Sequence, residues 1–312
     1  MKLEFGVYLP AMLPTEMVKE WSVTSEKLGF DSIWISDHLM DPFPPILSPW
    51  RGCLEGWTAM SYFGGITKRV KLGHCVLIPD FKYPSVLAKM AATLDQLTNG
   101  RLILSLGAGW FRREFEAYGL PWDKHGVRIE REREAILVIK TLWTEEIANF
   151  DGKYYKLRDA VLEPKPIQTP HPPIWVGGDS PKTRELVAEL ADGWLMHGTT
   201  PDGVKKNLEA LKQIGDNRVK IIKYATMLTT VMSSNREEAN RKLEQNFPEE
   251  ILKQFLRAPV RKEFRNRIAG SSEECIAQIE QYAEAGINHL ILLFIDPMDT
   301  KIFADEVLPS FK

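Results

Sequence analysis

The feature that most constrains the fold is a regular alternation between short apolar runs and longer segments of helical period. Runs rich in β-branched and aromatic residues predict buried strands, and apolar residues recurring at intervals of three and four predict helices. Strands are expected at residues 3–9, 32–36, 70–78, 101–109, 174–178, 193–198, 220–231 and 289–294. Helices are expected at 14–28, 55–68, 84–98, 128–146, 181–191, 201–213 and from Ser271 or Ser272 to Gly286. Because parallel strands need helical crossovers, this order predicts a parallel sheet covered by helices.

Eight strands is the number that closes a (β/α)₈ TIM barrel. Two segments interrupt the alternation. The first is a hairpin about Asp151-Gly152 together with the proline-rich stretch 163–173 that follows it, and the second is a charged helical segment at 235–267. We therefore expect residues 1–312 to form one domain, a barrel with insertions. A doubly wound open sheet is the alternative, although "GAGWFR" lacks the third glycine of the dinucleotide fingerprint and "GGDSPKT" lacks the second glycine of a P-loop.

Charge and composition exclude several classes of partner. Lys and Arg total 40 against 42 for Asp and Glu, and a net charge of −2 offers no broad attraction to nucleic acids or anionic membranes. No apolar stretch approaches the ~20 residues that span a bilayer, and the start has no signal-peptide pattern. Three cysteines without a C-x-x-C pair fit a reducing compartment. We expect a cytoplasmic protein that acts on a small molecule and has no metal site.

Polar groups follow the predicted strands at the end where barrels build their active sites. The run "GFDSIWISDHL" (29–39) ends on Asp37 and His38, an acid beside an imidazole. Imidazole can give or take a proton at neutral pH, which suits a hydride transfer that leaves a proton to be moved. The structural alternative is that His38 ends a strand and Asp37 serves a helix N-terminus. The other strand ends are Leu9-Pro10, Cys75-Val76-Leu77, Ala108-Gly109-Trp110, Gly177-Gly178-Asp179 and His197-Gly198-Thr199.

Several longer stretches resemble one protein family. They are "GFDSIWISDHL", "VKLGHCVLIP", "ATLDQLTNGRLILSLGAGWFRREFEAYG", "FDGKYY", "PKPIQTPHPPIWVGGDSPKTRELVAELADGWL" and "YAEAGINHLILLF". Through the number and order of these stretches, nearly the whole chain resembles the bacterial-luciferase-like flavin and deazaflavin oxidoreductases. The resemblance is to the coenzyme F420-dependent branch related to methylenetetrahydromethanopterin reductase. The resemblance implies an α/β barrel with insertions, a homodimer, and hydride transfer between cofactor C5 and a small organic substrate. The "SDH" triplet favours coenzyme F420 over FMN. An FMN-dependent monooxygenase and a barrel that has lost its cofactor remain alternatives.

The resemblance also implies roles for particular residues. Asp37 and His38 would lie at the reactive ring of the cofactor as catalytic residues, with Asp37 contacting the cofactor or the substrate. A non-prolyl cis peptide at Cys75–Val76 would back that ring, and Gly107, Ala108 and Gly109 would let the chain pass close to it. The late loops would hold the cofactor phosphate through backbone N–H groups, with Gly177, Gly178 and Ser180 in one loop and His197, Gly198 and Thr199 in the next.

The chain departs from the deazaflavin sugar-phosphate dehydrogenases at two places. They carry a glutamate proton donor where this chain has Trp110, and a tryptophan shortly after the Asp-His pair where Met40, Asp41 and Pro42 stand here. Glu114 could turn inward, but the sequence favours a carboxylate on a helix surface. Trp110 and two further tryptophans of the predicted mouth, Trp50 and Trp57, are candidate walls of an apolar substrate pocket.

Overall fold

Eight parallel strands form the centre of the molecule in a computed structural model that describes residues 3–43, 52–214, 217–255 and 266–312. The strands are β1 (Glu4–Tyr8), β2 (Ser32–Ile35), β3 (Lys71–His74), β4 (Leu104–Leu106), β7 (Ile174–Gly177), β8 (Gly193–His197), β9 (Lys223–Met232) and β11 (His289–Phe294). They pair in the order β3-β2-β1-β11-β9-β8-β7-β4. Single bridges, Leu72 to Leu102 and Leu77 to Leu106, join the two ends of this row, so the predicted barrel is confirmed.

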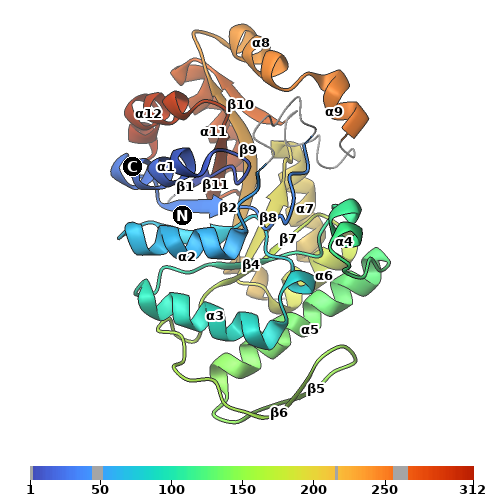
Figure 1. The fold of residues 1–312 in the computed structure, drawn as a ribbon. Helices are drawn as coiled ribbons and strands as arrows, with labels where there is room; N and C mark the ends of the chain where they lie inside the picture. Colours follow the sequence, from blue (N-terminus) through green and yellow to red (C-terminus); the bar gives the residue numbers. More distant parts are fainter. Residues whose placement is uncertain (1–2, 44–51, 215–216, 256–265) are drawn as a thin grey trace.

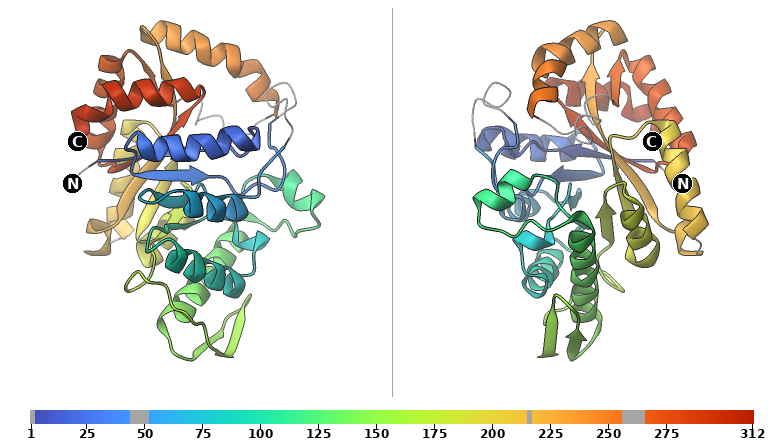
Figure 2. Two further views of the ribbon diagram at one scale, coloured as in Figure 1. Left: turned by 60° about the vertical axis from the view of Figure 1, so that its left-hand side comes forward. Right: turned by 90° about the vertical axis from the view of Figure 1, so that its right-hand side faces the viewer.

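Helices wrap the outside of the barrel in the predicted alternation (Figures 1 and 2). The predicted ones are α1 (Thr15–Lys27), α2 (Gly56–Ile66), α3 (Pro84–Leu97), α5 (His125–Thr144), α6 (Pro181–Leu190), α7 (Pro201–Ile214) and α11 (Ser272–Ala285). A further helix, α12 (Pro297–Glu306), follows the last strand. The ends of α11 illustrate why the prediction succeeded. Ser271 and Glu274 form a capping box, and Gly286 ends the helix with a φ of 110°.

Both predicted insertions are present, and besides short 3-10 turns the described residues form two helices and one strand that were not predicted. β5 (Ala148–Asp151) and β6 (Lys156–Ala160) form an antiparallel hairpin at the lower edge of Figure 1, and α8 (Arg236–Asn246) and α9 (Glu249–Phe255) lie at the upper edge. The unpredicted elements are α4 (Arg112–Ala117), β10 (Arg267–Gly270) and α12. β10 pairs in parallel with β9, so the expectation that the helical segment continues to residue 267 is wrong at its end.

Alternation along the strands divides the core into two parts. Trp34 and Trp175 face the inside of the barrel with ring centroids 5.1 Å apart, and Tyr8, Ile103, Leu195 and Ile291 pack with them. The intervening residues, such as Ile33 and Ile35, pack outward against the helices. Within the described residues, no helix is long and apolar enough to cross a bilayer.

The amino ends of the strands are closed by a buried polar series. Trp34 Nε1 donates to Ser32 Oγ at 2.7 Å, and Ser32 Oγ lies 2.9 Å from His289 Nε2. His289 Nδ1 lies 3.1 Å from a Glu4 carboxylate oxygen. The hydrogen bond from His289 lowers the pKa of Glu4 to about 2. These contacts fill the floor of the barrel, so the opposite, carboxyl end is the one at which the predicted site residues lie.

Candidate active site

The carboxyl ends of the strands bring several of the predicted site residues into one inward layer. By alternation from Trp34, Ser36 faces the inside of the barrel directly above the aromatic layer. The same alternation, counted from Ile103, Trp175 and Leu195, places three further residues in this layer: Gly107, Gly177 and His197. Cys75 and Val76 pack against the same inner cluster. Small and polar side chains thus replace the large aromatic ones at the mouth of the barrel.

The Cys75–Val76 peptide is cis, as the resemblance implied. Val76 is held between two of the glycines that were predicted to approach the cofactor. A Cβ added at Gly107 would overlap Val76 Cγ2, and one at Gly177 would lie 2.7 Å from Val76 Cγ1. These two positions therefore need glycine for the packing of Val76, a reason that the sequence alone did not indicate.

Asp37 is only 1% exposed, and both of its carboxylate oxygens have protein partners. Oδ1 accepts a hydrogen bond from Lys82 Nζ at 2.7 Å, and Oδ2 accepts one from the Ile78 N–H at 3.1 Å. Lys82 Nζ also lies 3.0 Å from Glu55, the N-cap residue of α2. The Asp37 carboxylate therefore ties the end of β2 to the segment after β3. The role of Lys82 was missed because it lies 45 residues from its partner.

Burial and pairing act in opposite directions on this group of charges. Burial raises the pKa of Asp37, while Lys82 and the Ile78 N–H act against the rise. For Lys82, burial alone would lower the pKa, but the carboxylates of Asp37 and Glu55 raise it above its ordinary value. Burial also acts against the ionised form of Glu55, yet hydrogen bonds from Thr58 and the charge of Lys82 lower its pKa to about 2. Lys82 is thus a firmly held cation between two acids.

His38 is paired with a residue that the sequence left undecided. Glu114, in α4, is fully buried, and both of its carboxylate oxygens lie 3.2 Å from His38 Nδ1. One of them also accepts the backbone N–H groups of Leu39 at 2.5 Å and Met40 at 3.1 Å. Glu114 therefore turns inward, and of the two alternatives the helix-surface carboxylate is wrong.

The three candidate pocket tryptophans have different environments. Trp110 is half-buried and presents its ring edge-to-face to His38, with centroids 5.7 Å apart, and Phe111 lies 6.4 Å from the same imidazole. Trp57 is 6% exposed and stacks on His74 at 5.6 Å in the apolar core, so its described contacts are packing contacts. Trp50 lies outside the described residues.

The residues predicted to hold a phosphate lie at the ends of β7 and β8, where one of their side chains and three of their carbonyls have hydrogen-bond partners in the protein. Ser180 Oγ caps α6 by accepting the Thr183 N–H at 3.1 Å. The Gly178 carbonyl accepts the indole N–H of Trp194 at 2.7 Å. The carbonyls after His197 are bound as well, Gly198 by the Asn266 side chain and Thr199 by the Tyr282 hydroxyl at 2.9 Å.

The loop after β4 is held by a buried arginine that sequence reasoning missed. Arg128 Nε donates to the Ala108 carbonyl at 2.9 Å, and its Nη2 donates to the Gly109 carbonyl at 3.3 Å. Its guanidinium stacks over Trp122 at 3.6 Å. Only the position of Arg128 on the apolar face of a long helix could have indicated that this charge is buried.

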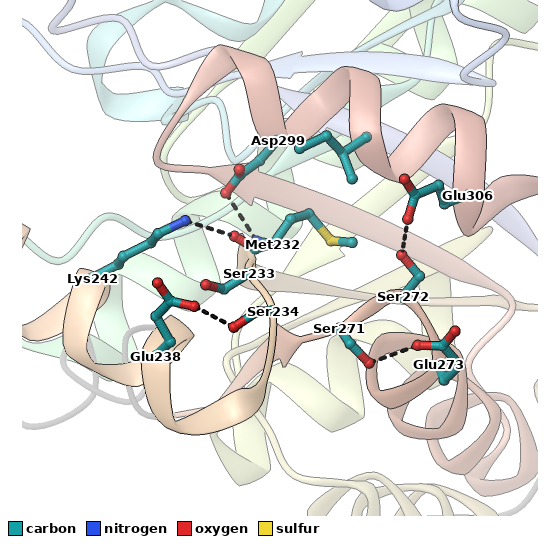
Figure 3. Close-up of a pocket in the computed structure, with 11 residues that line it drawn as sticks. Met232, Ser233, Ser234, Glu238, Lys242, Ser271, Ser272, Glu273, Asp299 and Glu306 are labelled. Carbon is teal, nitrogen blue, oxygen red and sulfur yellow. Dashed lines mark hydrogen bonds between the residues drawn. The ribbon is translucent and has the colours of Figure 1, made fainter.

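A surface hollow of about 510 Å³ lies away from this cluster, between α8, α11 and α12 (Figure 3). Three of its four serines are paired with its carboxylates: Ser234 with Glu238, Ser271 with Glu273 at 2.8 Å, and Ser272 with Glu306. The buried hydroxyl of the fourth, Ser233, has no hydrogen-bond partner within the described residues. None of the residues that line it belongs to the Asp37–His38 cluster. We therefore place the candidate active site at the mouth of the barrel.

Comparison with known proteins identifies the family of the chain. Residues 3–289 match the family model described as luciferase-like monooxygenase. The F420-dependent glucose-6-phosphate dehydrogenase of Amycolatopsis mediterranei is 29% identical over 96% of this chain and 95% of its own. The FMNH2-dependent dimethylsulfone monooxygenase of Pseudomonas putida is 32% identical over 55% of this chain and 47% of its own.

Solved structures show the same fold. An F420-dependent secondary alcohol dehydrogenase in complex with an F420-acetone adduct superposes with a TM-score of 0.84 at 24% identity, covering both chains completely. A long-chain alkane monooxygenase superposes with a TM-score of 0.82 at 15% identity, covering 99% of this chain and 91% of the other. With 287 of its residues, 3–289, inside the matched model, the chain belongs to the luciferase-like monooxygenase family.

Proposed function

We propose that the protein is a coenzyme F420-dependent oxidoreductase that moves a hydride between C5 of the deazaflavin and a small carbonyl, alcohol or conjugated alkene. The observation that carries the proposal is the His38–Glu114 pair beside Asp37 at the mouth of the barrel. Relatives named as F420-dependent dehydrogenases match nearly the whole chain, whereas the FMNH2-dependent relative matches about half of it.

The residues at the mouth fit a flat, polar-edged ring. Ser36 is 3% exposed, and within the described residues its hydroxyl has no hydrogen-bond partner although it faces the barrel interior. An unpaired buried hydroxyl is unfavourable, and a ligand atom that pairs with it removes the penalty. Val76 supplies an apolar surface beside it. Cys75, Val76 and the Gly107–Gly109 loop would hold the ring, and the ends of β7 and β8 would hold the phosphate: Gly177, Gly178, Ser180, His197, Gly198 and Thr199.

When bound, coenzyme F420 supplies the site that accepts or donates the hydride. The chain then has to move one proton, and His38 is the group in position to do so. In alcohol oxidation the imidazole takes the hydroxyl proton as the carbonyl forms, and in carbonyl reduction it returns the proton to the oxygen. Asp37 does not need to titrate for this task, because its carboxylate is engaged by Lys82 and Ile78 and serves to position its neighbour.

The substrate pocket is expected to be apolar. Trp110 and Phe111 stack on each other at 5.2 Å and both face His38, so aromatic surface borders the group that moves the proton. Trp50 and Trp57 were the other two candidates for this pocket, but the described contacts of Trp57 are with the core, so Trp110 carries the proposal. A small ketone, secondary alcohol or enone suits this surface better than a sugar phosphate, because Trp110 stands where the sugar-phosphate dehydrogenases carry their acid.

Two measurements separate this function from the runner-up, an FMN-dependent monooxygenase that uses reduced flavin and oxygen. Fluorescence titration should give a lower dissociation constant for F420 than for FMN. Turnover of a panel of ketones, secondary alcohols and enones should consume no oxygen, because deazaflavin C5 is a carbon and reacts poorly with oxygen. Tighter FMN binding together with oxygen uptake would transfer the assignment to the monooxygenase.

We further propose that the enzyme is a cytoplasmic, one-domain homodimer whose only partner in catalysis is a small molecule. Exposed apolar side chains at and just before α3 support an interface: Tyr83, the N-cap residue, is 55% exposed, Val86 55% and Leu97 79%. A stable interface of ~2,000 Å² or more should survive dilution to micromolar concentration. Sedimentation that gives only a monomer of 35.6 kDa would contradict the dimer.

A further inference from the structure

Glu114 is a buried acid that the family resemblance did not assign. Its carboxylate is 0% exposed and receives hydrogen bonds from three directions: the imidazole of His38 and the backbone N–H groups of Leu39 and Met40. A buried carboxylate is stable only where donors compensate for the water that it has lost. Each of these three donors belongs to the segment 38–40, so Glu114 recognises both the backbone and the side chain at the end of β2.

The pairing decides which nitrogen of His38 carries the proton in the neutral ring. An ionised carboxylate can only accept hydrogen bonds, so the proton on the facing atom, Nδ1, is the one that the pair stabilises. The lone pair is then on Nε2, which becomes the atom that exchanges a proton with the substrate. The same carboxylate stabilises the imidazolium after the ring has taken a proton.

We propose that Glu114 is a positioning residue that fixes the Nδ1–H tautomer of His38 and stabilises its protonated form during turnover. The inference rests on the proposed function for the reaction itself, but the tautomer is a property of the resting protein. Glu114 does not exchange protons with the substrate, because its oxygens face His38 and the two backbone amides and no part of it is exposed.

The other charged groups near this loop make their described contacts with residues other than His38. Asp37 is paired with Lys82, and Lys82 in turn with Glu55. Asp41 accepts the Phe43 N–H through Oδ1 at 2.8 Å, and its Oδ2 is buried without a hydrogen-bond partner within the described residues. The thiol of Cys53 lies 3.5 Å from the His38 carbonyl, and burial raises its pKa to about 12, so it stays neutral. Glu114 is therefore the anion in direct contact with the ring.

The first test needs no substrate. Nitrogen-15 labelling of the histidine rings, with His38→Gln used to assign the signal, reports which ring nitrogen of His38 carries hydrogen. We expect a protonated Nδ1 and a bare Nε2 in the resting protein and a weakened preference in Glu114→Gln. A resting protein with hydrogen on Nε2 and none on Nδ1 would overturn the proposal, and this result would not depend on the cofactor assignment.

The second test uses turnover. Glu114→Gln keeps the shape and an acceptor oxygen but removes the charge, so kcat should fall on the order of 10²-fold or more while the F420 dissociation constant stays within a few-fold. The half-maximal pH of kcat/KM should move to a lower value, because the imidazolium loses its counter-charge. Glu114→Asp, which keeps the charge, should restore part of the rate.

A matched control separates positioning of the ring from anchoring of the loop. The hydroxyl of Tyr118, from the turn that follows α4, donates to the Leu39 carbonyl at 2.6 Å without a contact to His38 among the described residues. Tyr118→Phe should leave kcat and the pH profile unchanged. His38→Ala should lower kcat by roughly 10²–10⁴-fold, and adding Glu114→Gln to it should lower kcat no further. Additive losses, or a Glu114→Gln enzyme with the parent pH profile, would make Glu114 a structural anchor only.

Discussion

Ser36 has the shortest side chain of the Ser36-Asp37-His38 triplet and is the member whose side chain has no hydrogen-bond partner among the described residues. Its hydroxyl is buried at the mouth of the barrel, and a hydrogen bond of this kind is worth about 0.5–1.5 kcal/mol when it is made. Ser36→Ala should therefore raise the F420 dissociation constant by roughly 3–10-fold. In the cofactor-free protein the same change should leave the free energy of unfolding unchanged or higher, because it removes an unpaired polar group.

Thr226 offers the matched control. Its hydroxyl is also buried and unpaired within the described chain, but alternation along β9 turns it away from the barrel interior. Thr226→Val should affect the unfolding free energy in the same direction and leave F420 binding unchanged. Equal cofactor affinities in Ser36→Ala and the parent, measured by fluorescence titration, would remove Ser36 from the binding site.

The pair of Lys82 and Asp37 acts between elements, because it joins the end of β2 to the segment that follows β3. Lys82→Met leaves Asp37 buried without its cation, and breaking a buried pair from one side costs about 3 kcal/mol or more. Burial raises the pKa of Asp37, so protonation at lower pH removes the buried charge. The stability lost in Lys82→Met should therefore shrink as the pH falls. Urea unfolding of the parent and the variant at several pH values measures this difference.

Lys71→Met provides the comparison. Lys71 pairs with Glu4 at 3.2 Å, but its side chain is 45% exposed, and exposed pairs contribute about 0–1 kcal/mol. If both variants lose the same stability at every pH, the Lys82 pair is an ordinary surface contact and does not hold the strand ends together.

Elements were predictable where their signals are local. The eight strands, the hairpin and the capped helix α11 follow from periodicity, turn residues and capping residues that lie next to one another in the sequence. β10 was not predictable in the same way, because four residues with an arginine at the start carry little periodicity and acquire their strand character by pairing with β9. The helix α4 is six residues long and directly follows a glycine loop, so it lacks the repeated apolar stripe on which a helix prediction depends.

The candidate site divides in the same way. The sequence indicated Asp37 and His38 through a motif and the cis peptide at Cys75–Val76 through the family resemblance, and the structure confirms the cis peptide. The roles of Glu114 and Lys82 were not indicated, because each acquires its role from a contact with residues 76 and 45 positions away in the sequence. Tertiary contacts alone distinguish a buried acid such as Glu114 from an exposed one on a similar helix.

At the scale of the whole molecule, stability should fall as the medium becomes alkaline. Glu132, in α5, is 1% exposed, neither of its oxygens has a partner within the described residues, and burial raises its pKa to about 8, with a further contribution from Asp80. A group whose pKa is higher in the folded state than in the unfolded state adds to the free energy of unfolding at low pH. That contribution is lost as the pH rises from the unfolded pKa to the folded pKa. For Glu132 the loss occurs between about pH 4.5 and about pH 8.

Buried histidines act in the lower part of that window. Burial lowers the pKa of His74 to about 3, so His74 makes stability rise with pH until its unfolded value of about 6.5 is passed. Between pH 6.5 and 8 Glu132 dominates, and at about 1.4 kcal/mol per unit the parent should lose roughly 2 kcal/mol. Glu132→Gln should remove this slope in urea unfolding, whereas Glu130→Gln, on the exposed side of the same helix, should keep it.

The polar series at the floor of the barrel has the connectivity of a hydrolase triad: a serine hydroxyl on an imidazole, whose other nitrogen faces a carboxylate. Ser32 and His289 are 0% exposed, and the indole N–H of Trp34 occupies the serine oxygen from the remaining side. A nucleophile also needs a path for its substrate, and this one is enclosed by the innermost layer of the barrel. A fluorophosphonate probe should therefore leave Ser32 unlabelled while the protein is folded, so the presence of a triad in a structure says nothing about esterase activity until the access of its serine is known.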